Sequence, residues 1–214
     1  MVVVQRLRFL IMLAAEVMKI DTVIFDVGRV LVDLDFQPLL GCMARSAQQY
    51  TMNEVIAAID LHAHERGEID GTELIDRLHG LTPLVERAEV HRGWLNMFAP
   101  VKPMFGLMND LKARYQVHLL SNVGDLHWAH LNEQYDLCAQ AHDAIPSFRA
   151  GVMKPDEKIY QLAEAQFALT PARTVFIDDL EPNVIAARQR GWHSIQHQTP
   201  QQTIQLLLEM GVEC

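Results

Sequence analysis

Carboxylate, hydroxyl and ammonium side chains stand near the points where short apolar runs of the sequence end. They are Asp26, Ser121, Lys154, Asp178 and Asp179. Carboxylates can act as nucleophiles or as oxygen ligands of a divalent cation, while hydroxyl and ammonium groups can hold an anion. Taken singly, each has a simpler explanation: a turn at Asp26, helix capping by Ser121 and the Asp178–Asp179 pair, and a surface position for Lys154. A shared catalytic or binding role becomes the better explanation only if the fold brings these five residues together.

The apolar runs themselves are predicted to be buried strands, because they are short and rich in β-branched and aliphatic residues. They cover residues 20–25, 117–120, 174–177 and, more weakly, 192–195. Apolar residues at helical spacing predict helices over residues 105–114, 126–135, 156–167, 183–190 and 203–210. Pro155 suits the first position of the third helix, and Gly191 suits the end of the fourth. Strands that alternate with helices predict an α/β fold, a parallel sheet with helices on both faces.

In such a sheet, ligands bind at the carboxyl ends of the strands, and the polar residues listed above follow those ends. Together they offer what phosphoryl transfer needs. Asp26 is a candidate nucleophile, and with Asp178 and Asp179 it offers hard oxygen ligands for Mg²⁺. Ser121 can hold phosphate oxygens. Because three carboxylates repel one another, both a metal ion and Lys154 are needed to balance their charge.

Residues 36–99 interrupt the alternation, since they contain helical patterns and no good strand. The expected helices cover residues 37–50, 53–63, 71–79 and 84–94. We interpret the segment as an all-helical cap over the sheet edge, inserted into a core of residues 18–35 and 100–214. The alternative is an extra helical layer with no lid role.

Residues 1–17 need separate treatment. An apolar run at 9–15 follows Arg6 and Arg8, as in a short signal peptide, but it is shorter than the roughly 20 residues that span a bilayer. Cleavage near Ala15 would leave few residues before the first strand, and the sequence restarts at Met18. We therefore expect an N-terminal extension ahead of the domain. The alternative is a helix packed on its surface.

Composition excludes several classes of protein. The chain has 214 residues, is 50% hydrophobic and has a net charge of −9, which is typical of a globular protein. The acidic balance, without a run of Lys or Arg, disfavours nucleic-acid and anionic-membrane binding.

The cysteines and histidines show no metal or disulfide pattern. Cys42, Cys138 and Cys214 form neither a disulfide framework nor a CxxC pattern, which favours a cytoplasmic location. The ten histidines include no HExxH motif, so that His127 and His130 are better read as a polar helix face than as a zinc site. The sequence does not indicate the oligomeric state.

Four motifs in order carry a family resemblance. They are V-I-F-D-V-G-R-V-L-V-D at 23–33, H-L-L-S-N at 118–122, G-V-M-K-P at 151–155 and V-F-I-D-D-L-E-P-N at 175–183. The set resembles the haloacid dehalogenase-like (HAD) hydrolase superfamily. That resemblance implies a Rossmann-like core with a helical cap between the first two motifs. The block H-E-R-G-E-I at 64–69 is similar to the cap of the subgroup that contains bacterial α-D-glucose-1-phosphate phosphatase. It is more distantly similar to the phosphatase domain of soluble epoxide hydrolase.

The resemblance also implies a role for each motif residue. Asp26 would attack the phosphorus and form an aspartyl-phosphate, which water then hydrolyses. Ser121, with Asn122 nearby, would bind the phosphoryl group, and Lys154 would stabilise its charge. Arg29 would face either the substrate or the cap hinge. The groups expected to hold Mg²⁺ are Asp26, the backbone carbonyl of Gly28, Asp178 and Asp179, with Asn183 supporting their loop.

Gly28 departs from the common pattern, because most family phosphatases carry a second Asp two residues after the nucleophile as general acid. The glucose-1-phosphatase subgroup shares the glycine, so the departure does not by itself imply inactivity. His62, His64 and Glu65 are candidate replacement acids, although a surface helix face is the simpler interpretation. We therefore expect a Mg²⁺-dependent phosphatase for a small phosphorylated metabolite such as a sugar phosphate. The alternatives are a 2-haloacid dehalogenase, a non-catalytic phosphate-binding or interaction protein and, more weakly, a phosphomutase.

Overall fold

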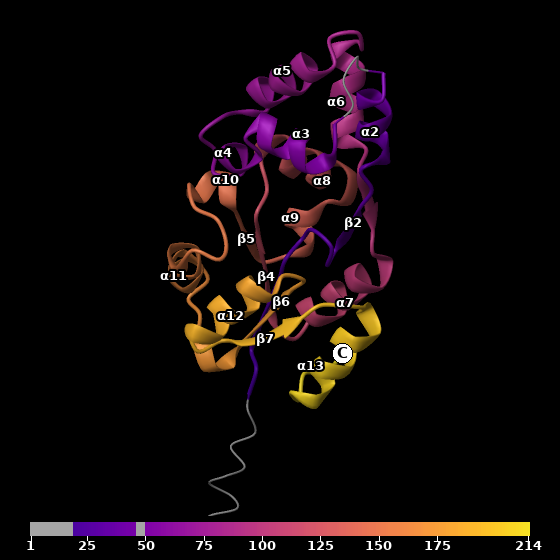
Figure 1. The fold of residues 1–214 in the computed structure, drawn as a ribbon. Helices are drawn as coiled ribbons and strands as arrows, with labels where there is room; N and C mark the ends of the chain where they lie inside the picture. The colour runs from indigo at the N-terminus through magenta and orange to yellow at the C-terminus, as the bar shows by residue number, and fades with distance from the viewer. Residues whose placement is uncertain (1–18, 46–49) are drawn as a thin grey trace, which may run out of the picture.

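The computed structural model describes residues 19–45 and 50–214, so the expected extension at residues 1–17 lies outside the described part (Figure 1). Its centre is a five-stranded parallel sheet with the strand order β5-β4-β1-β6-β7. The strands are β1 (Thr22–Phe25), β4 (Gln116–Ser121), β5 (Asp143–Pro146), β6 (Thr174–Asp178) and β7 (His193–Gln196). This confirms the predicted fold class.

Helices cover both faces of the sheet, because successive side chains of a strand point to opposite sides. Val23 and Phe25 belong to one buried cluster, and Ile24 belongs to another. The helices that contribute to the first cluster are α7 (Lys102–Lys112), α8 (Asp125–Tyr135), α9 (Leu137–Gln140) and α13 (Pro200–Glu209). Those of the second are α11 (Glu157–Gln166) and α12 (Glu181–Gln189). Two short elements, α10 (Ser147–Ala150) and the 3₁₀ turn η1 (Pro171–Arg173), complete the core.

The remaining helices lie between β1 and α7 and have an apolar cluster of their own. We call this part of the chain the helical segment: α2 (Gln37–Met43), α3 (Met52–Ile59), α4 (Leu61–Glu65), α5 (Gly71–Leu81) and α6 (Arg87–Leu95). An antiparallel pair, β2 (Val32–Leu34) and β3 (Phe98–Pro100), brackets it. In Figure 1 it forms the upper, indigo-to-magenta part of the molecule, and the sheet with its flanking helices forms the lower part.

Several local expectations were wrong. The helix expected over residues 53–63 is two helices, because Asp60 has a left-handed backbone (φ 52°) that ends α3 and begins α4. In the described part of residues 37–50, α2 ends at Met43. The segment 36–99 was expected to lack strands, yet β3 begins at Phe98. Pro155 precedes the capping residue Asp156 instead of occupying the first turn.

Two expectations from composition can be compared with the structure. All three cysteines are free thiols, as expected; Cys42 is buried, and the other two are exposed. Within residues 19–45 and 50–214, no helix combines the length and apolarity needed to cross a bilayer.

Candidate active site

The carboxyl ends of β1, β4 and β6 bring the predicted residues to one edge of the sheet. Phe25 of β1 is level with Leu119 on one side and Ile177 on the other. Asp26, the next residue, donates its backbone N–H to the carbonyl of Ile177 at 2.8 Å and so continues the strand register. Ser121 and Asp178 are the last residues of the two neighbouring strands. The register of the three strands therefore places these three polar side chains side by side.

Lys154 joins two of these carboxylates. Its Nζ lies 2.9 Å from Asp26 Oδ1 and 2.6 Å from Asp178 Oδ2. All three residues are buried, with exposed fractions of 4%, 7% and 0%. Burial opposes the charge of Lys154, but the two carboxylates more than offset it and raise the pKa of the ammonium group. The lysine is therefore a fixed buried cation and not a solvated surface residue.

Asn122 holds the backbone of Lys154 in place. Its side-chain Oδ1 accepts the Lys154 N–H at 2.8 Å, and its Nδ2 donates to the Lys154 carbonyl at 2.9 Å. The two ends of the amide are thus engaged across a separation of 32 residues in the chain. Asn122 was expected near the substrate, and the structure shows that it positions the loop that carries the lysine.

Asp178 is held just as firmly from its other side. Asn183 Nδ2 lies within 2.9 and 3.1 Å of the two carboxylate oxygens, and the backbone N–H of Leu180 donates to Oδ1 at 2.9 Å. Asn183 is in turn fixed by the Tyr160 hydroxyl, which donates to its carbonyl at 3.0 Å. A carboxylate held by this many donors has a fixed orientation.

Asp26, Asp178 and Asp179 form an acidic cluster in which one oxygen from each lies within 4.8 Å of the others. Burial raises the pKa of Asp26 to about 7, with Lys154 opposing the change and Asp178 adding to it. Burial also raises the pKa of Asp179, and Asp178 contributes there too. The cluster brings three carboxylates together, whereas Lys154 is a single buried cation beside them. Hard oxygen donors and a deficit of positive charge fit a divalent cation such as Mg²⁺.

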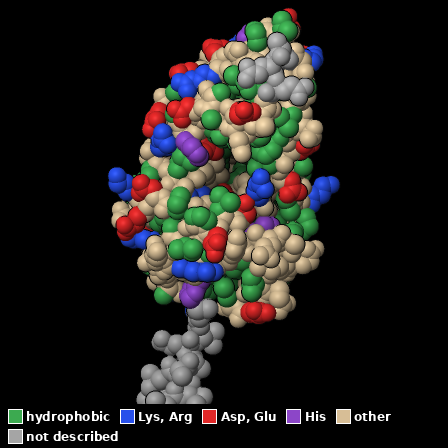
Figure 2. All heavy atoms as spheres, in the orientation of Figure 1, with side chains coloured by type: hydrophobic (Ala, Val, Ile, Leu, Met, Phe, Trp, Pro, Cys, Tyr) green, Lys and Arg blue, Asp and Glu red, His purple; other side chains and the backbone are tan. Residues whose placement is uncertain are grey.

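A cavity of about 760 Å³ opens above this cluster. Asp26, Lys154 and Asp179 line its floor, and Leu61, His62 and Glu65 of α4 line it from the helical segment. Figure 2 shows this face of the molecule hollowed between the helical segment and the sheet. The site is thus enclosed from both parts of the chain.

Gly28 and Arg29 occupy the turn that follows Asp26. A Cβ placed on Gly28 would meet no atom within 4 Å, so the turn has room for a side chain there. Arg29 has a left-handed backbone (φ 57°), and its guanidinium Nε lies 4.0 Å from Asp179 Oδ2 with the side chain 60% exposed. Both residues line the cavity. Arg29 therefore adds an exposed positive charge at its rim.

His64 does not face this cavity, and the expectation of a surface position for it was wrong. The residue is 1% exposed, with Nδ1 3.3 Å from the Ile69 carbonyl and Nε2 3.6 Å from Asp125 Oδ1. A Cβ on Gly124 would lie 2.0 Å from His64 Nε2, so the imidazole occupies space that only a glycine leaves open. His64 therefore docks the helical segment onto α8.

Glu65 does face the site. Its side chain is 18% exposed, and Oε2 lies 3.5 Å from His62 Nδ1. Burial raises the pKa of this carboxyl, with His62 and Lys154 opposing the change. Its backbone is fixed because the Ser147 hydroxyl donates to the Glu65 carbonyl at 2.6 Å. Gly67 turns with φ 72° directly beside the Phe148 carbonyl, where a Cβ would lie 2.3 Å away. The histidine and glycine of the block at 64–69 are the sequence signal for this docking.

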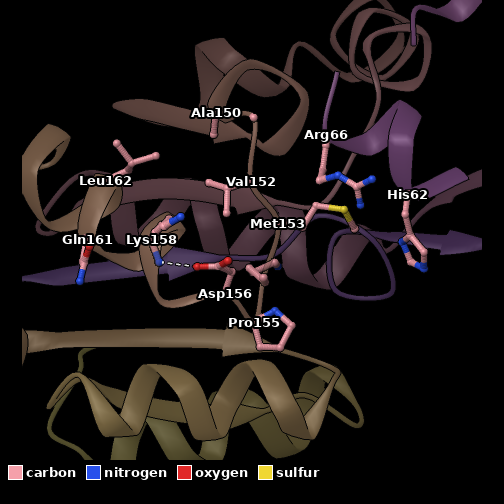
Figure 3. Close-up of a pocket in the computed structure, with 12 residues that line it drawn as sticks. His62, Arg66, Ala150, Val152, Met153, Pro155, Asp156, Lys158, Gln161 and Leu162 are labelled. Atoms are coloured by element: carbon pink, nitrogen blue, oxygen red, sulfur yellow. Dashed lines mark hydrogen bonds between the residues drawn. The ribbon is translucent and has the colours of Figure 1, made fainter. Parts of the chain in front are cut away.

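A wider groove of about 810 Å³ adjoins the site on the α11 side. It shares His62, Met153, Lys154 and Pro155 with the cavity above the acidic cluster. Figure 3 shows Arg66 and His62 on one side of this groove and Lys158, Gln161 and Leu162 on the other. Both cavities are therefore lined by Lys154.

Comparison with known proteins supports a hydrolase. No protein-family profile matches the chain. The sesquiterpene phosphatase astK of Aspergillus oryzae is 27% identical over 172 residues, which cover 78% of this chain and 85% of that protein. Acyl-CoA dehydrogenase family member 10 of Mus musculus is 33% identical over 63 residues, 29% of this chain. This second match spans only 6% of the mouse protein.

Solved structures resemble the whole fold. An HAD-family enzyme from Bacteroides thetaiotaomicron, in complex with magnesium and inorganic phosphate, has a TM-score of 0.74 at 23% identity and covers 84% of this chain and 94% of that one. L-2-haloacid dehalogenase from Xanthobacter autotrophicus has a TM-score of 0.60 at 17% identity, covering 91% and 84%. The protein therefore has the fold of the HAD-family hydrolases.

Proposed function

We propose that the protein is a Mg²⁺-dependent phosphatase that forms an aspartyl-phosphate on Asp26. The observation that carries this proposal is the placement of Lys154 between Asp26 and Asp178, beside Asp179 and beneath a cavity. Two of the similar proteins support it: one is named a phosphatase, and another was crystallised with magnesium and phosphate. Their names do not identify the substrate of this chain.

The arrangement around Asp26 suits in-line attack on phosphorus. Oδ1 accepts hydrogen bonds from Lys154 Nζ and, at 2.7 Å, from the Val27 N–H. Among the described residues none hydrogen-bonds to Oδ2, which can therefore act as the nucleophile. A bond forms between Oδ2 and phosphorus, the bond from phosphorus to the ester oxygen breaks, and that oxygen keeps the electron pair. Water then hydrolyses the aspartyl-phosphate and regenerates the carboxylate.

Other residues would bind and neutralise the phosphoryl group. Ser121, 2% exposed at the end of β4, would donate its hydroxyl hydrogen to a phosphate oxygen, and Lys154 would balance developing charge. Mg²⁺, held by Asp26, Asp178, Asp179 and the Gly28 carbonyl, would supply electrostatic stabilisation of the phosphate when bound. We also propose that residues 36–99 act as a cap on a core of residues 18–35 and 100–214, and that the enzyme is cytoplasmic.

Phosphate release in the presence of Mg²⁺ tests the proposal. The purified protein should hydrolyse p-nitrophenyl phosphate with Mg²⁺, and EDTA should abolish that activity. A haloacid dehalogenase uses no metal, so halide release from 2-chloropropionate that survives EDTA would instead establish the alternative. A protein with neither activity would be the non-catalytic binding protein.

We further propose that Glu65 is the general acid that replaces the side chain missing at Gly28. Glu65 faces the cavity from α4, and burial favours its protonated form. His62 is the weaker candidate because its side chain is 68% exposed. A general acid contributes about 10²–10⁴-fold when the leaving group is poor and far less when it is good.

Replacing Glu65 with glutamine should therefore separate two substrates. We expect kcat for an alkyl phosphate to fall by about 10²-fold or more. The kcat for p-nitrophenyl phosphate should change little, since nitrophenolate leaves without a proton. Steady-state phosphate release measures both values. Glu68→Gln is the matched control, because Glu68 is an exposed glutamate that pairs with Arg66 on the same loop.

An acid restored at Gly28 gives the complementary result. The open space around Gly28 should accept an aspartate, so Gly28→Asp in the Glu65→Gln background should recover turnover of the alkyl phosphate. Equal losses for both substrates in Glu65→Gln, with no recovery in the double variant, would show that Glu65 has another role.

A further inference from the structure

A second, smaller cavity of about 140 Å³ opens from the predicted phosphoryl site and has an apolar wall. The two cavities share six lining residues, including Gly28, Asn122, Glu65 and Leu61. Ser121, the expected phosphate donor, lines the smaller cavity as well. The smaller cavity therefore adjoins a phosphate held between Asp26 and Ser121 and offers a space for the group attached to it.

Both parts of the chain build the apolar wall. The helical segment and its flanks contribute Phe36, Met52, Ile56, Leu61, Trp94 and Phe98. Met52 and Ile56 lie one helical turn apart on α3, and both are half-buried. Trp94 is 2% exposed and stacks on His127, with ring centroids 4.4 Å apart.

His127 brings no charge to the cavity. Its Nε2 donates to the Trp94 carbonyl at 3.0 Å, and burial lowers its pKa to about 3, so the imidazole is neutral. The sequence-based interpretation of His127 as part of a polar helix face was therefore wrong. Within the described residues, the polar groups of the lining are the side chains of Glu65, Ser121, Asn122 and His127 and the indole N–H of Trp94, which is buried without a hydrogen-bond partner. Glu65, Ser121 and Asn122 also belong to the predicted chemistry. The remaining residues of the lining are apolar.

From this geometry we infer that the small cavity is a subsite for a compact hydrocarbon group, and that the substrate is the phosphate monoester of an apolar alcohol. This inference rests on the proposed phosphatase activity of the same site. An apolar protein cavity of about 150 Å³ holds a benzene molecule, so the group has roughly six carbon atoms.

A pair of substrates with equal numbers of non-hydrogen atoms tests the inference. They are 3-methylbutyl phosphate and glycerol 3-phosphate, both esters of primary alcohols. Each buried methylene favours binding by a factor of about four, and an unpaired buried hydroxyl opposes it. We expect kcat/KM to be about 100-fold higher for 3-methylbutyl phosphate. Equal values, or a preference for glycerol 3-phosphate or glucose 1-phosphate, would overturn the inference.

Two variants connect that preference with the cavity. Leu61→Asn keeps the size of the side chain but makes it polar, and should lower the preference about tenfold. Leu208→Asn is the matched control, because Leu208 is a half-exposed leucine on α13. Ile56→Phe should fill the cavity and lower kcat/KM for 3-methylbutyl phosphate far more than for methyl phosphate. An unchanged preference in both Leu61→Asn and Ile56→Phe would place the hydrocarbon elsewhere.

A binding measurement keeps the subsite separate from the activity. Methyl NMR spectra of methionine-labelled protein without Mg²⁺ should show shifts at Met52 and Met97, which line the cavity, when 3-methyl-1-butanol is added. Met104 and Met108 lie in the core against the sheet and should not shift, and glycerol should shift none of the four. Shifts without phosphate release from any ester would refute the phosphatase and leave the subsite intact. Release without shifts or preference would refute the subsite alone.

Discussion

Phosphate release should fall by at least about 10⁴-fold when Asp26 is replaced by asparagine. The amide has nearly the shape of the carboxylate, so the buried position beside Lys154 is kept while the nucleophilic oxygen is lost. The folded state should survive, since burial already disfavours the charge of Asp26, as its raised pKa shows. The melting temperature and the rate of phosphate release together measure the two effects.

A carboxylate at the other end of the same strand provides the control. Asp21 immediately precedes β1 and forms an ion pair of 2.8 Å with Arg173 at the surface. Asp21→Asn should leave the rate unchanged and reduce stability by no more than about 1 kcal/mol. An intermediate can also be trapped, because acid quenching during turnover should leave a phosphoryl group on the wild-type peptide that contains Asp26. Turnover by Asp26→Asn at the wild-type rate would remove Asp26 from the role of nucleophile.

The strand-end residues could be predicted from the sequence because one rule places them. An apolar run of four to six residues predicts a buried strand, and parallel strands end at a common edge. Asp26, Ser121 and Asp178 needed no knowledge of packing to be placed together. The position of Lys154 was less certain from the sequence around it, since its burial depends on a loop that Asn122, just after β4, holds in place.

Two residues of the helical segment could not be placed by this reasoning. Glu65 and His64 are neighbours on a five-residue helix, yet one faces the cavity and the other is buried against Gly124. Their orientation is determined by contacts with α8 and α10, which no local pattern encodes. Similarly, β5 was not predicted because its apolar content is one alanine and one isoleucine before Pro146. It forms a strand because β4 pairs with it at the sheet edge.

Lys154→Met should affect both stability and turnover. The ammonium group pairs with two buried carboxylates, and removing one partner of a buried ion pair typically destabilises a protein by about 3–5 kcal/mol. Turnover at saturating Mg²⁺ should fall by about 10²–10³-fold, because the developing phosphoryl charge loses a fixed cation. Chemical denaturation and steady-state phosphate release measure the two losses. Lys102→Met, at an exposed position on α7, should change neither.

The response to Mg²⁺ then separates charge balance from simple packing. With Lys154 replaced, the acidic cluster has lost its buried cation, so Mg²⁺ should raise the melting temperature of Lys154→Met more than that of the wild type. Lys154→Ala removes the same charge but also leaves a cavity. If Mg²⁺ restores more stability to Lys154→Met than to Lys154→Ala, the difference between the two variants reflects the lost packing. If Mg²⁺ stabilised the wild type and Lys154→Met equally, the lysine would not be balancing the charge of the metal site. Its ion pairs with Asp26 and Asp178 would then be structural. Another cation would have to balance the negative charge of the phosphoryl group, and Arg29 at the cavity rim is a candidate.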